Sequence, residues 1–91
     1  MSRLAKLAQL SAKEVCKILG SQGFIPVRQS GSHIVMQKRA LGSTTTAIVP
    51  SHGNRSLAIG TLSGIIDQAS LPRHLFDVGA RQIRRDNALS L

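Results

Sequence analysis

The sequence predicts a small α+β fold in which one helix is followed by three antiparallel strands and a second helix. Two observations carry this prediction. Apolar residues recur at helical spacing near residues 12–21 and again after residue 60. The chain between them is rich in β-branched residues and is interrupted by glycines at turn positions. Because 91 residues gain little from dividing their core, we expect a single domain over residues 1–91.

The first helix is predicted over residues 12–21. Ser11 and Glu14 have the spacing of a capping box, in which each side chain accepts a hydrogen bond from the backbone amide of the other. Apolar residues then fall on one face, and lysines point outward. The apolar positions are Ala12, Val15, Ile18 and Leu19. Gly23 is suited to ending the helix.

Three strands follow, and turn residues separate them. We expect the strands at residues 24–29, 33–38 and 44–49. Pro26 cannot donate a hydrogen bond to a neighbouring strand, so the first strand should lie at an edge of the sheet. Residues 29–32 form a turn around Gly31, and residues 39–43 form a loop that contains Gly42.

The second helix starts near Gly60 and carries its apolar stripe inward. Its apolar positions are Leu62, Ile65, Ile66 and Ala69. Ser70 to Pro72 closes it, and a short helical turn runs through Phe76. Both helices must cover one face of the sheet to bury their stripes. This is the architecture of double-stranded RNA-binding domains, although architecture alone argues nothing about activity.

The charge of the chain indicates an anionic partner. The chain contains twelve Lys and Arg and four Asp and Glu, which gives a formal net charge of +8. Such an excess favours nucleic acid, because binding phosphates releases condensed counterions. An acidic protein partner would also complement this excess of positive charge. Both readings account for the imbalance better than a purely solvating surface does.

Several classes of protein and site are disfavoured. Cys16 is the only cysteine, so no internal disulfide forms. No stretch reaches the length of a transmembrane helix, and the N-terminus lacks the apolar segment of a secretory signal. We therefore expect a cytoplasmic protein without a membrane partner. The cysteine and the histidines lack metal-ligand spacing, and the carboxylates are scattered, so we expect no metal and no cofactor.

Six segments together resemble the HicA family. They cover roughly residues 10–71 in the family's order, with residues 72–91 as a basic C-terminal extension that contains Arg81, Arg84 and Arg85. The segments are Leu10–Val15, Gly23-Phe24, Arg28–His33, Val49–His52, Gly60–Leu62 and Ile65–Ala69. An ordered set of this length is far more specific than any one motif.

The resemblance implies a function. HicA proteins are toxins of toxin–antitoxin pairs, have the double-stranded RNA-binding fold, cleave mRNA and are silenced by a HicB antitoxin. The family's catalytic histidine lies in a Gly-Ser-His motif, and it maps onto His33. Taken without the resemblance, His33 reads as a surface histidine at the start of a strand. Strand alternation directs Ile34 and Met36 toward the helices and leaves His33 accessible on the other face.

The chemistry that the resemblance implies needs no metal. RNA carries its own nucleophile, the 2′-hydroxyl, so a protein has to move protons and stabilise the charged phosphorus centre. Imidazole groups ordinarily titrate near neutrality and can serve as acid or base. The candidate catalytic residue is therefore His33.

Five further residues are candidates for RNA binding. These are Arg28, Ser32, Lys38, Arg39 and His52. Each has an ordinary alternative: Ser32 completes a turn, His52 is solvated in its loop, and the three cations form a solvated basic face. Phe24 and Phe76, the only aromatic residues, are expected in the core. Without a stacking platform, RNA binding should depend on the backbone, with little sequence preference.

Two other functions remain open. One is a module that grips RNA without cutting it, and the other is an interaction protein whose basic face serves an acidic antitoxin. Replacement of His33 separates cleavage from binding. The sequence does not fix the RNA target or the oligomeric state.

Overall fold

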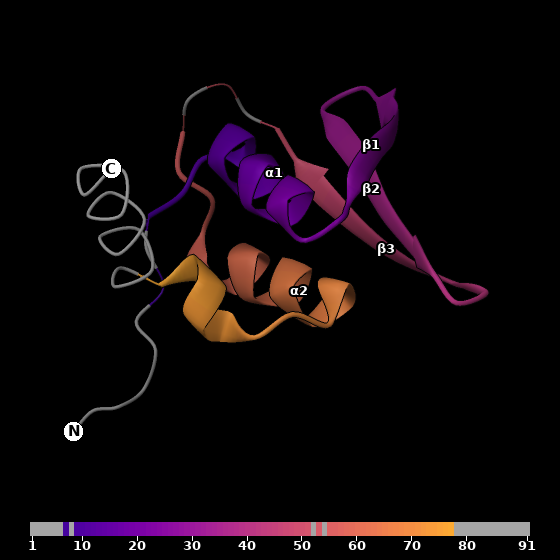
Figure 1. Ribbon diagram of the computed structural model, residues 1–91. Helices are drawn as coiled ribbons and strands as arrows, with labels where there is room; N and C mark the ends of the chain where they lie inside the picture. Colours follow the sequence, from indigo (N-terminus) through magenta and orange to yellow (C-terminus); the bar gives the residue numbers. More distant parts are fainter. Residues whose placement is uncertain (1–6, 8, 52, 54, 78–91) are drawn as a thin grey trace, which may run out of the picture.

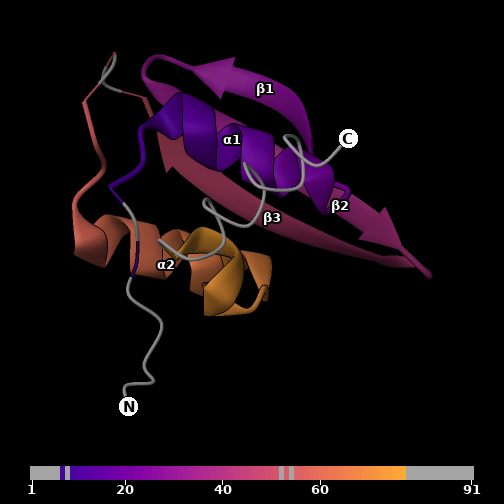
Figure 2. The same ribbon diagram turned by 60° about the vertical axis from the view of Figure 1, so that its left-hand side comes forward.

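The computed structural model describes residues 7, 9–51, 53 and 55–77. Its elements are α1 (Ala12–Ser21), β1 (Ile25–Ser30), β2 (His33–Ala40), β3 (Ser43–Pro50), α2 (Ile59–Ala69) and the 3-10 helix η1 (Arg73–Phe76). The strands form one antiparallel sheet in the order β1-β2-β3. Both helices lie on the same face of it (Figures 1 and 2). The predicted α+β fold is confirmed.

Helix α1 has the predicted bounds and the predicted cap. The Ser11 hydroxyl accepts a hydrogen bond from the Glu14 amide at 3.3 Å, and the Glu14 carboxylate accepts one from the Ser11 amide at 3.0 Å. This capping box satisfies two of the amides that a helix leaves without intrahelical partners. After the helix, Gly23 takes a φ of +96°, which only glycine adopts at low cost.

The turn between β2 and β3 is shorter than the loop predicted at residues 39–43. Arg39 and Ala40 continue β2, and Ser43 already belongs to β3. Only Leu41 and Gly42 lie between the strands, both at positive φ, 51° and 81°. Two positive angles define the type I′ hairpin turn, whose twist matches that of the strands. Leucine rarely adopts this conformation, so the sequence favoured a longer loop.

The two edges of the sheet are protected against pairing with a further strand in different ways. The strand order confirms that β1 lies at an edge, and on this strand Pro26 lacks an amide proton and the pairing register shifts between Pro26 and Arg28. On β3, the amide of Ile48 donates a hydrogen bond at 2.9 Å to the side-chain oxygen of Gln68 in α2. Proline, bulges and covering helices all limit strand addition at an edge.

The core lies between the helices and the sheet. Phe24 and Phe76 are 2% and 0% exposed, as predicted for the two aromatic residues. The largest fully buried aliphatic side chains are Leu10, Val15, Leu19, Val49, Leu62, Ile65 and Ile66. The helices pack chiefly over β3, whereas every residue of β1 is exposed. The side of β1 that faces α1 is therefore left partly open.

The described part of the chain contains no helix that is long and apolar enough to cross a membrane. The arginines of the C-terminal extension, Arg81, Arg84 and Arg85, lie outside the described residues.

Candidate functional site

The turn between β1 and β2 is tightly held. Ser30 pairs with His33, so Gly31 and Ser32 form a two-residue hairpin turn. Gly31 has a φ of +59°, and such turns require a positive φ at their first central position. The carbonyl of Ser32 accepts a hydrogen bond from the amide of Ser51, just after β3. The turn is thereby anchored to the end of β3.

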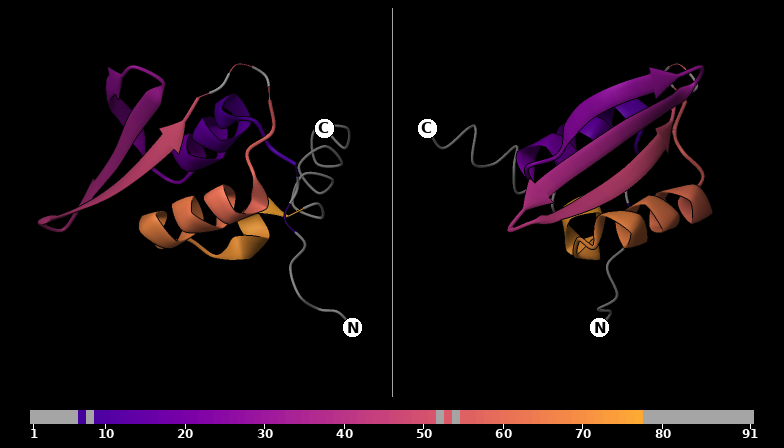
Figure 3. Two further views of the ribbon diagram at one scale, coloured as in Figure 1. Left: turned by 180° about the vertical axis from the view of Figure 1, so that it is seen from behind. Right: turned by 90° about the vertical axis from the view of Figure 1, so that its right-hand side faces the viewer.

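His33 is the first residue of β2 and stands at this anchored turn. It pairs with Ser30 on one side and with Pro50 on the other. Its side chain is exposed, while Ile34 and Met36 face the helices and contribute to the core side of the sheet. The predicted alternation along β2 is therefore observed. His33 lies at the end of the open face of the sheet, which the right-hand view of Figure 3 turns toward the reader.

Two of the predicted RNA-binding residues lie close to His33 in the hairpin. Ser32 precedes it in the turn, and Arg28 pairs with Val35, two residues along β2. By strand alternation, Arg28 and His33 project from the same face of the sheet. Both Arg28 and Ser32 are exposed. The backbone thus gathers an imidazole, a guanidinium and a hydroxyl at one corner of the sheet.

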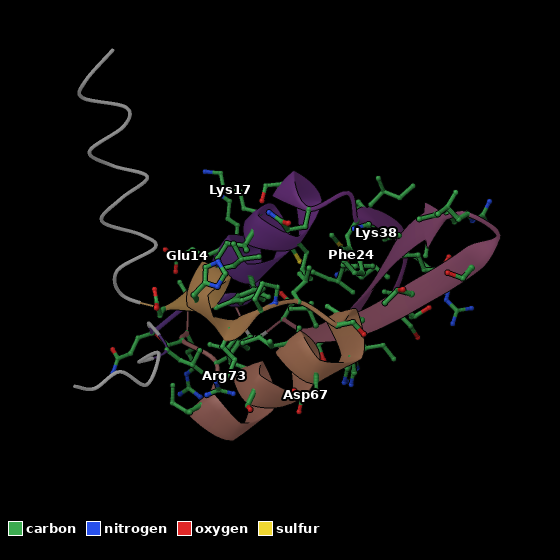
Figure 4. All side chains as sticks on the ribbon, turned by 60° about the horizontal axis from the view of Figure 1, so that its bottom comes forward. Glu14, Lys17, Phe24, Lys38, Asp67 and Arg73 are labelled. Atoms are coloured by element: carbon green, nitrogen blue, oxygen red, sulfur yellow. The ribbon has the colours of Figure 1, made fainter. Side chains whose placement is uncertain are left out.

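Lys38 and Arg39 lie at the other end of β2. At about 3.3 Å per residue they stand roughly 16–20 Å from His33 along the strand. They also face opposite sides. The Lys38 stem lies on the helix side beside Gly23 (Figure 4), whereas Arg39 lines a pocket of about 340 Å³ on the open face with Ile25 and Val27. The structure does not bring these two cations to the turn.

His52 falls outside the described residues. His74 is exposed on η1, within the last described segment of the chain.

A groove between α1 and β1 ends near the same turn. Its volume is about 610 Å³. Among the described residues it is lined by Lys13, Cys16, Lys17, Gly20, Phe24, Pro26, Gln29, Ile34, Met36, Ser51 and Gly53. Lys13 and Lys17 are exposed on α1, and Lys17 extends away from the helix (Figure 4). The sequence placed these lysines on an outward helix face but gave no sign of the groove, because the groove depends on where α1 packs on the sheet.

Cys16 lies on the apolar side of this groove. Burial raises the pKa of the Cys16 thiol, because desolvation disfavours the thiolate. The thiol therefore stays protonated at neutral pH and is a poor nucleophile. Its contribution to the groove is apolar contact.

A comparison with models of known protein families identifies the family of this chain. Residues 12–71 match the family model described as HicA toxin of bacterial toxin-antitoxin. The chain belongs to the HicA toxin family. The match spans both helices, the whole sheet and the turn that carries His33. No curated protein and no solved structure matches the chain.

Membership makes this HicA chain the toxin type of a toxin–antitoxin system and implies a HicB-type antitoxin as its partner. Within the residues that the structure describes, no group of three or more His, Cys, Asp or Glu side chains is arranged to hold a metal ion.

Proposed function

We propose that this HicA-family chain is an endoribonuclease that cleaves mRNA in the cytoplasm without a metal ion, with His33 as its proton-transfer residue. The observation that carries the proposal is the placement of His33. An exposed imidazole stands at a turn that Gly31 shapes and Ser51 anchors, inside the region that matches the family. A fixed and solvent-accessible acid or base is what RNA cleavage needs from a protein.

The reaction proceeds by internal transfer. A base removes the proton of a ribose 2′-hydroxyl, the 2′-oxygen attacks the adjacent phosphorus, and the bond to the 5′-oxygen breaks. The leaving 5′-oxygen takes up a proton. The products are a 2′,3′-cyclic phosphate and a 5′-hydroxyl. The imidazole of His33 performs one of the two proton transfers, as base or as acid.

The basic residues hold the RNA backbone. Arg28 and Ser32, at the same corner as His33, are placed to contact the reacting phosphate or its neighbour. Lys38 and Arg39, at the far end of β2, would contact phosphates more than one nucleotide away. His52 is proposed as a further phosphate contact. The net charge of +8 supports this use of the surface.

Expression in bacteria tests the proposal. Induction of the wild type should arrest growth and fragment mRNA, whereas His33→Ala at equal soluble level should do neither. His74→Ala is the matched control, since His74 is also exposed but lies on η1, and it should behave like the wild type. Arrest and mRNA loss that persist in His33→Ala would refute the role of His33.

The second candidate is a module that binds RNA or an antitoxin without cleaving RNA. This function is favoured because the reaction needs two proton transfers, and only one group, His33, is assigned to them. If wild type and His33→Ala are equally harmless and leave mRNA intact while both bind RNA, this second function replaces the first.

A further inference from the structure

The groove between α1 and β1 has no part in the proton transfers described above. It arises because the helices pack over β3 and leave the α1 side of β1 uncovered. Its far end reaches Gln29 and Ser51, and these two residues flank the turn: Gln29 donates a hydrogen bond at 3.4 Å to the carbonyl of Gly31, and Ser51 donates one to Ser32. A ligand in the groove would therefore reach the helix side of the turn, whereas the side chain of His33 lies on the open side of the same turn.

The lining combines three kinds of chemistry, each at its own place in the groove. Cys16, Pro26 and Ile34 provide apolar walls over a floor formed by the buried Phe24 and Met36. The amide of Gln29 and the hydroxyl of Ser51 offer donors and acceptors near the turn. Lys13 and Lys17 supply positive charge on the α1 side. No described residue of the lining is acidic.

This arrangement of apolar walls, a polar end and positive charge on one side matches the chemistry of a nucleotide. A base has two apolar faces and a polar edge, and a phosphate is attached on one side of it. A volume of about 610 Å³ lies within the roughly 300–1,000 Å³ of small-ligand sites. Apolar walls can hold a base without an aromatic partner when its edge is hydrogen-bonded. An acidic peptide would also suit the lysines, but the side-chain oxygen of Gln29 and the hydroxyl of Ser51, beside the turn, favour the polar edge of a base.

We propose that the groove binds one unpaired base of the RNA on the helix side of the turn, with Lys13 and Lys17 on the flanking phosphates, and that the strand passes around the turn to reach His33 on the open side. The proposal rests on the proposed function for the choice of RNA as ligand. It makes the substrate single-stranded at this position, because a base inside a duplex cannot enter the groove. It also predicts a base preference at one nucleotide, which the absence of exposed aromatic residues had argued against.

Gly20 offers a test that separates groove filling from loss of stability. It lines the groove, lies in α1, and a Cβ atom there would meet nothing within 4 Å. Gly20→Leu therefore places a side chain in the groove and also replaces a helical glycine with a better helix former. Gly64 is the matched control, since it lies within α2, has the same open space at Cβ and does not line the groove.

Binding is measured by fluorescence anisotropy in the His33→Ala background, so that cleavage does not interfere. The probes are fluorescein-labelled ten-nucleotide oligo(A), oligo(C) and oligo(U), and a sixteen-base-pair RNA duplex. Gly20→Leu should weaken single-strand binding about tenfold or more, and Gly64→Leu should leave it unchanged. Without either glycine substitution, one homopolymer should bind more tightly than the others, and neither substitution should change duplex binding.

Equal single-strand affinity of the Gly20→Leu and Gly64→Leu proteins, or no RNA binding at all, would overturn the inference. If Gly20→Leu weakens binding to the antitoxin and leaves RNA binding unchanged, the groove is a protein site and the inference is also wrong. Failure of the proposed function looks different. Wild type would then cleave no RNA, although Gly20→Leu still selectively lost single-strand binding.

Discussion

His33 owes its accessibility to its place in the strand. As the first residue of β2 it follows a glycine turn, and the alternation of β2 turns its side chain away from the helices. This much follows from the sequence, because Ile34 and Met36 mark the inward face. The same alternation continues past Met36, so Lys38 lies on the helix side of the sheet and Arg39 on the open side. Lys38 and Arg39 therefore point to opposite faces and do not form a single patch.

A second residue-scale feature that the sequence predicts is the cap of α1. Ser11→Ala removes the hydroxyl that accepts from the Glu14 amide, and it should lower the free energy of unfolding by about 1 kcal/mol. Urea denaturation followed by circular dichroism measures the change. Ser21→Ala is the control at the other end of α1, where the hydroxyl donates to the Ile18 carbonyl and accepts only from the side-chain amide of Gln22 in the described contacts. A loss at Ser21 equal to that at Ser11 would contradict the capping account.

At the scale of elements, the order and approximate bounds of every helix and strand were predictable, and the length of the β2–β3 hairpin was not. Local propensity favours leaving Arg39 to Ser43 as a loop. Cross-strand pairing extends both strands and forces Leu41 to a φ of 51°. A leucine in that conformation costs free energy that the added pairing offsets.

This strain gives an element-scale prediction. Leu41 is fully exposed, so its replacement loses no packing. Leu41→Asn creates an Asn-Gly turn that adopts the type I′ conformation readily, and it should raise the free energy of unfolding by about 1 kcal/mol. Leu41→Val should lower it, because a β-branched residue tolerates positive φ poorly. The urea midpoints of the two variants check this, and an Asn variant no more stable than the wild type would argue against a strained turn.

At the scale of the whole molecule, tertiary packing creates what no local pattern contains. The groove exists because α1 lies over β3 and leaves β1 open, and this placement brings Lys17 of α1 to the same cavity as Gln29 of β1 and Ser51 after β3. The residues are far apart in sequence, and each alone reads as an ordinary surface or strand residue. The net charge of +8 indicated an anionic ligand, but only the fold shows where it would meet an apolar surface.

The most direct test of the central claim is the chemistry of the cleaved ends. Purified wild type is incubated with labelled single-stranded RNA in excess EDTA, and the products are identified by mass spectrometry. Our account predicts 2′,3′-cyclic phosphate and 5′-hydroxyl ends, no cleavage of DNA of the same sequence, and a rate at least about a hundredfold lower for His33→Ala. Products with 3′-hydroxyl and 5′-phosphate ends, or an undiminished rate in His33→Ala, would contradict it.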